Sequence, residues 1–213
     1  MVYSIEPVHW SVHENTVEYA AAEVTHQEQH GSRLALLNAL ETFGSALYMS
    51  GEWGTAEQAL RRAADLAVDN PNTQTSRAGL AALLAGRGDH DDATDLILSI
   101  ERAFVCVEPG PTPRLWLLAR RGEVALAAGS ATAADDLLAA ERAALEIGLR
   151  SVRTVRFRRS LVEALVNSGR IEEARGAAER LTVDARRGDV DSAMADADAA
   201  EAIVAAAGGD DSR

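Results

Sequence analysis

The chain has 213 residues, 47% of them apolar, and a net charge of −12, which suits one large or two small globular domains with a sizeable core. It contains 21 arginines and no lysine, so Schiff-base and phosphate-loop lysines are excluded. The single cysteine, Cys106, excludes an internal disulfide and a thiolate zinc site, and the acidic charge argues against nucleic-acid binding.

The N-terminal segment predicts a single helix and no targeting signal. It lacks a basic start followed by an apolar block, and the chain has no apolar run of about 18 residues. We therefore expect a cytoplasmic protein with no membrane partner. Asn15 and Thr16 predict the start of a helix that runs to about His30, and Gly31 and Ser32 predict a break after it.

Four similar turns follow at nearly regular spacing, and each lies between two helical apolar patterns. Their glycines are Gly51, Gly88, Gly129 and Gly169. Glycine just past a helix is a typical stop, because it adopts the left-handed conformation without a Cβ penalty. Small residues recur seven positions earlier, where two helices of a hairpin would cross: Gly44, Ala81, Gly122 and, less small, Val162. Each unit is thus predicted to be a helix, a glycine turn and a second helix.

One hairpin cannot bury its own apolar faces, so the units are expected to stack. The clearest copy consists of Leu40, Phe43, Gly44, Leu47, Ala56, Leu60 and Ala63. This pattern resembles the tetratricopeptide repeat, in a divergent bacterial form. The resemblance implies an all-α protein, a right-handed α-solenoid of about four helix hairpins with flanking N-terminal and C-terminal helices. It also implies a non-enzymatic module that binds a protein or peptide, in a regulatory or adaptor role and without a cofactor.

The expected organisation follows from the repeats. It comprises an N-terminal flank at 1–36, repeats at about 37–72, 74–106, 113–149 and 152–187, and a capping helix with a tail at 188–213. Pro113 predicts the start of a helix after the loop that contains it. Asp191 and Ser192 predict the start of the final helix, which runs to about Ala207.

The resemblance places the first helix of each hairpin on a concave, ligand-binding groove. The residues it assigns to the groove are Asn38, Glu41, Ser45, Tyr48 and Met49 in the first repeat, Thr75, Ala78, Ala82 and Ala85 in the second, Trp116, Ala119, Glu123 and Leu126 in the third, and Arg156, Arg159, Glu163 and Asn167 in the fourth. The middle of such a groove would be small and apolar, and its C-terminal end would be cationic.

Two of these assignments have a second interpretation. Arg156 and Arg159 belong to a run with Arg150, Arg153 and Arg158, which predicts either a clamp for an acidic segment or ion pairs with neighbouring helices. Trp116 is either an interaction anchor or a core residue.

Two other functions and a homodimer remain open. The chain could be the effector-sensing part of a bacterial transcription-regulatory system whose DNA-binding component lies elsewhere. It could also bind a metal through N-terminal histidines, because His26 and His30 lie one helical turn apart with Glu23 nearby, and His9 and His13 have the same spacing.

Overall fold

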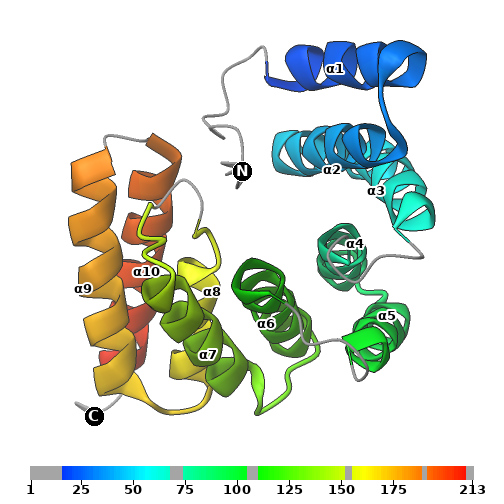
Figure 1. The fold of residues 1–213 in the computed structure, drawn as a ribbon. Coiled ribbons are helices and arrows are strands. Elements are labelled where there is room, and N and C mark those ends of the chain that lie inside the picture. Colours follow the sequence, from blue (N-terminus) through cyan, green and yellow to red (C-terminus); the bar gives the residue numbers. More distant parts are fainter. Residues whose placement is uncertain (1–15, 68–73, 105–109, 152–154, 189–190, 210–213) are drawn as a thin grey trace. The chain divides into compact units, whose positions relative to one another are not determined.

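The computed structural model describes residues 16–67, 74–104, 110–151, 155–188 and 191–209 (Figure 1). These residues are 85% helical and contain no strand, which confirms the all-α class. Their ten helices are α1 Thr16–His30, α2 Arg33–Ser50, α3 Trp53–Leu66, α4 Thr75–Gly86, α5 His90–Phe104, α6 Pro111–Ala127, α7 Ala133–Glu146, α8 Arg158–Asn167, α9 Ile171–Gly188 and α10 Asp191–Gly208. Within the described ranges, every helix is too short or too polar to cross a membrane.

The chain divides into two compact units, and the boundary falls within α7. The N-terminal unit is residues 12–140, and the C-terminal unit is residues 141–213 together with 1–11. The described part of the N-terminal unit therefore runs from α1 into α7. That of the C-terminal unit begins at Glu141 and contains α8, α9 and α10.

In the N-terminal unit, successive helices pack in two rows. Helix α4 packs against both α2 and α6, so these three helices lie side by side (Figure 1). Helix α3 packs against α2 and α4, and α5 packs against α4 and α6, which places α3 and α5 in the second row. Each helix thus buries its apolar stripe against the preceding and following helices.

The four turn glycines end their helices as the sequence predicts. At the first turn Gly51 has φ +86°, and the amide of Glu52 donates a 2.9 Å hydrogen bond to the carbonyl of Leu47. This bond, which spans five residues, is the Schellman motif, and a left-handed residue is required to make it. The same bond recurs at the other three turns, donated by Asp89, Ser130 and Arg170. A fifth left-handed glycine, Gly148, ends α7 with a bond from Leu149 to Ala144; it was not predicted.

Small residues allow the hairpin helices to cross closely. A Cβ added to Gly44 would lie 2.7 Å from Cγ of Leu60, and one added to Gly122 would lie 2.5 Å from Cγ of Leu137. The predicted crossing points are confirmed at these two positions. In the third hairpin, however, the sequence pattern pointed to Leu138, which is half-buried, whereas Leu137 is fully buried. The longer turn before α7 accounts for this difference, because α7 begins four residues after Gly129 and α3 begins two residues after Gly51.

The predicted starts and ends of helices hold to within two residues. Helix α1 ends at His30, and Ser32 caps α2 by accepting a 3.2 Å hydrogen bond from the amide of Ala35. Helix α6 begins at Pro111, two residues before the predicted Pro113. Its first position needs no amide donor and suits the fixed φ of proline.

The C-terminal unit is built around a buried arginine. Helices α8, α9 and α10 pack against one another (Figure 1). Nε of Arg158 donates to Glu141 over 3.1 Å, and its Nη1 donates to Asp184 of α9 over 2.8 Å. The side chains of Arg158 and Glu141 are only 5% and 9% exposed. Glu141, which departs from the repeat pattern, is therefore buried together with a cationic partner, as a buried charge requires.

Candidate functional site

The first element of the candidate site is a half-buried stripe along α2. Asn38, Glu41, Ser45 and Tyr48 are spaced three or four residues apart, which places them on one side of the helix. The structure leaves all four partly exposed, and Met49 beside them is also partly exposed. The sequence assigned these same five residues to a ligand-binding surface.

Glu41 connects this stripe to α4. The hydroxyl of Ser76 donates a 2.9 Å hydrogen bond to Oε2 of Glu41, and Ser76 is itself fully buried. Burial raises the pKa of Glu41, while the hydrogen bonds from Ser76 and Thr75 and the charge of Arg120 oppose that rise. The carboxylate of Glu41 is thus removed from water and held by short polar side chains of the adjacent helix.

Helix α6 brings the third element of the site, a charged pair one turn from Trp116. Nη1 of Arg120 lies 2.6 Å from Oε2 of Glu123, and these side chains are 35% and 20% exposed. The charge of Glu123 is the largest cause of a raised pKa at Arg120, against which burial acts, and Tyr48 and Glu41 also contribute to the rise. Arg120 is therefore close enough to α2 to interact electrostatically with two of its residues.

We call this surface the α2–α4–α6 face. It consists of Asn38, Glu41, Ser45 and Tyr48 of α2, Thr75 and Ser76 of α4, and Trp116, Arg120 and Glu123 of α6. With Glu41 ionised its charged groups carry one net negative charge. The face offers carboxylate acceptors, the guanidinium donors of Arg120 and two aromatic side chains, which is a set of groups suited to recognition.

The two aromatic residues of this face are both partly exposed. The ring of Tyr48 lies 5.7 Å from that of Trp53, centroid to centroid, and its hydroxyl lies near Gly86 at the end of α4. Trp116 is half-buried on α6 and is absent from the fully buried core, so part of its ring can contact a ligand.

Sequence reasoning missed Ser76 and Arg120 and assigned three alanines to a surface that they do not line. Ala78, Ala85 and Ala119 are buried to 4% exposure or less and belong to the core. Arg120 follows Trp116 by four residues, so its spacing was a usable signal. The partner of Ser76 could not be read from the sequence, because it lies 35 residues away.

The remaining predicted site residues lie in the C-terminal unit. Arg156 is partly exposed with its Nη2 3.9 Å from Asp196, and Arg159 and Asn167 are exposed on α8, where Glu163 is half-buried. Arg158 of the same run is used internally, as described above. Arg153 lies outside the described residues.

The histidines predicted as a metal alternative lie on α1. The rings of His26 and His30 stack with centroids 5.0 Å apart, and Glu23 accepts a 2.6 Å hydrogen bond from Gln27. Across the described ranges there is no group of three or more His, Cys, Asp or Glu side chains placed to hold a metal ion. His9 and His13 lie outside those ranges.

Comparisons with protein-family models, with curated proteins and with solved structures returned no match.

Proposed function

We propose that this chain is a non-enzymatic helical-repeat module, similar to tetratricopeptide arrays, that binds a protein or peptide segment on the α2–α4–α6 face. The observation that carries this proposal is the meeting of Glu41, Ser76 and the Arg120–Glu123 pair on one partly exposed surface. Charged groups with perturbed pKa values that converge on a surface are concentrated at functional sites.

The chemistry of the face favours recognition of a polypeptide. An extended or helical segment presents backbone amides and carbonyls, which match the carboxylates of Glu41 and Glu123 and the remaining N–H groups of Arg120. Tyr48 and Trp116 supply aromatic area at the same surface, and such residues are enriched where binding energy concentrates. A regulatory or adaptor role in the cytoplasm, without cofactor or direct nucleic-acid contact, completes this proposal.

The predicted preference for an acidic partner rests on Arg156 and Arg159, and it applies to the C-terminal unit alone. Guanidinium groups bind carboxylates in a bidentate geometry, so exposed arginines suit an acidic segment. The charge reversals Arg156→Glu and Arg159→Glu test this separate point, because they leave the α2–α4–α6 face unchanged. Loss of affinity for acidic peptides supports the preference, and unchanged affinity removes it.

Selection from a random peptide library on the immobilised full chain tests the proposal. The test variant is Glu41→Gln with Arg120→Gln, which removes one charge of each sign. Its matched control is Glu146→Gln with Arg102→Gln, because these residues are exposed and outside the face. Circular dichroism establishes that both variants remain helical.

We expect peptides that bind the parent and the control with similar Kd and the test variant at least about tenfold more weakly, since hydrogen bonds to charged groups are lost. Failure to enrich any peptide, or equal Kd for all three proteins, contradicts the assignment of this face.

A further inference from the structure

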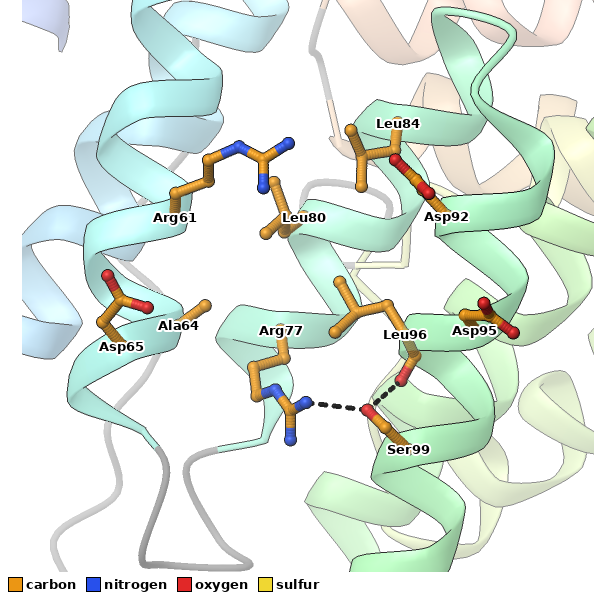
Figure 2. Close-up of a pocket in the computed structure, with 10 residues that line it drawn as sticks. All are labelled: Arg61, Ala64, Asp65, Arg77, Leu80, Leu84, Asp92, Asp95, Leu96 and Ser99. Atoms are coloured by element: carbon orange, nitrogen blue, oxygen red, sulfur yellow. Dashed lines mark hydrogen bonds between the residues drawn. The ribbon is translucent and has the colours of Figure 1, made fainter.

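A second candidate site lies between α3, α4 and α5 in the N-terminal unit. An open pocket of about 670 Å³ is lined by residues of all three helices: Arg61, Ala64, Asp65, Arg77, Leu80, Leu84, Asp92, Asp95, Leu96 and Ser99 (Figure 2). Helices α3 and α5 each pack against α4, so the pocket is the space between them and α4 forms its floor. Its volume falls in the range of ligand-binding clefts.

The pocket is on a different side of α4 from the α2–α4–α6 face. At about 100° per residue, Arg77, Leu80 and Leu84 fall on one side of the helix, roughly opposite Thr75. Leu80 and Leu84 are each only 4% exposed and belong to the core, so the floor is apolar and fixed in position. The charged side chains come from the surrounding positions of all three helices (Figure 2).

Arg77 is a partly buried cation whose hydrogen bonds within the described residues go to neutral groups. Its Nη1 donates to Oε1 of Gln74 over 2.8 Å, and its Nη2 donates to the hydroxyl of Ser99 over 2.7 Å. Ser99 in turn donates to the carbonyl of Leu96, which fixes its orientation. Burial lowers the pKa of Arg77. None of the ion pairs among the described residues includes Arg77, so a ligand carboxylate would supply the missing counter-charge.

Three carboxylates surround this cation without neutralising it. Asp65 of α3 and Asp92 and Asp95 of α5 are exposed, and within the described ranges none forms an ion pair. The other arginine of the pocket, Arg61, is already paired with Glu57 at 2.7 Å. The pocket therefore presents one available positive group, three negative groups and an apolar floor.

From this arrangement we infer that the α3–α4–α5 pocket is a second peptide site, which binds a partner segment with an acidic residue flanked by basic residues. The acidic side chain pairs with Arg77, the basic side chains pair with Asp65, Asp92 and Asp95, and apolar residues between them lie on Leu80, Leu84 and Leu96. Charge complementarity on both sides of Arg77 carries the choice of ligand.

Three labelled pentapeptides with blocked ends test the inference by fluorescence anisotropy on the full chain. Their orders are Lys, Leu, Glu, Leu, Lys for the matched peptide, Glu, Leu, Lys, Leu, Glu for the reversed one, and Gln, Leu, Gln, Leu, Gln for the neutral one. We expect the matched peptide to bind about tenfold more tightly than the other two. Equal binding of the three, or no measurable binding of the matched peptide, overturns the inference.

Two variants locate the binding, each with a matched control. Arg77→Gln is compared with Arg102→Gln, an exposed arginine of α5 outside the pocket, and Asp92→Asn with Asp95→Asn is compared with Asp198→Asn on the C-terminal unit. We expect about a tenfold loss of matched-peptide affinity in both test variants and none in the controls. The aspartates are exposed, so their variant remains informative if Arg77→Gln fails to fold. Retained affinity in a folded test variant overturns the inference.

Two further measurements distinguish a peptide bound in this pocket from one bound on the α2–α4–α6 face and from self-association. The Glu41→Gln with Arg120→Gln variant should bind the matched pentapeptide like the parent, so failure of the proposed function would leave this result intact. Light scattering of the parent and of Arg77→Gln tests a second copy of the chain as the occupant. A dimer that forms only in the parent would replace the partner peptide with self-association and overturn the choice of ligand.

Discussion

The hydroxyl of Ser76 on α4 lies 2.9 Å from Oε2 of Glu41 on α2, and it donates a hydrogen bond to a carboxylate whose pKa is raised by burial. This contact joins two first helices of successive hairpins through polar groups instead of apolar ones. It has a measurable cost in stability, because a buried carboxylate is poorly solvated, and that cost depends on pH.

Replacing Glu41 with Gln should therefore change how stability depends on pH. As the pH rises above the ordinary glutamate value of 4.5, the unfolded chain loses the proton first, so the parent is destabilised until the folded carboxyl also ionises. Glutamine still accepts the bond from Ser76 and cannot ionise. We expect Glu41→Gln to gain stability relative to the parent between about pH 4 and pH 8 in urea unfolding.

The exposed Glu52→Gln change is the matched control for that experiment. Its stability difference from the parent should stay nearly constant with pH. A Glu41→Gln difference that is constant with pH, or that moves in the opposite direction, would show that the carboxylate of Glu41 is not penalised by burial.

Close crossing of α2 and α3 predicts opposite effects for two Gly→Ala changes. A methyl group at Gly44 would meet Leu60 and the backbone carbonyl of Ala56, so Gly44→Ala should destabilise the chain by roughly 1–3 kcal/mol. Gly54 in the first turn of α3 has open space around it, and Gly54→Ala should be neutral or stabilise by up to about 1 kcal/mol. Thermal unfolding of both variants compares them, and equal effects would contradict the crossing.

The buried Arg158 predicts a large loss on truncation. Arg158→Ala would leave Glu141 buried without its cation, which typically costs about 3–5 kcal/mol. Arg175→Ala removes an arginine whose pair with Glu172 is largely exposed, and it should cost less than about 1 kcal/mol. If urea unfolding gives similar losses for the two variants, the Arg158 pair does not stabilise the C-terminal unit as described.

Metal removal should leave the fold unchanged. His26 and His30 form a stacked pair with no third ligand among the described residues, so we expect dialysis against EDTA to leave Tm unaltered. A fall in Tm that zinc restores in the parent, but not in a His26→Ala with His30→Ala variant, would instead establish a metal site on α1.

Local signals in the sequence were sufficient for the helices and their turns. Gly51 and its three counterparts combine a helix stop with a fixed distance from a small crossing residue, and both properties depend only on nearby residues. Pro111 was a local signal as well, although Pro113 was chosen as the first helical residue. Such features follow from backbone conformation and steric size, which a residue carries in any context.

Polar contacts between helices were much harder to predict. Ser76 meets Glu41 and Arg158 meets Glu141 only because particular helices pack in a particular rotation, and many acidic residues could have been the partner. The shift from Leu138 to Leu137 has the same origin, since two additional turn residues rotate α7. Stripe spacing identified Glu41, Tyr48 and Glu123, but the network that connects them depends on packing.

The most direct test of the central claim is an amide NMR titration of the isotope-labelled full chain with a peptide selected by the parent. The account predicts that the largest shift changes occur at Glu41, Ser76, Arg120 and Glu123, on the α2–α4–α6 face. Shift changes concentrated on α8 to α10, or along the α3–α4–α5 pocket with none at these four residues, would contradict it.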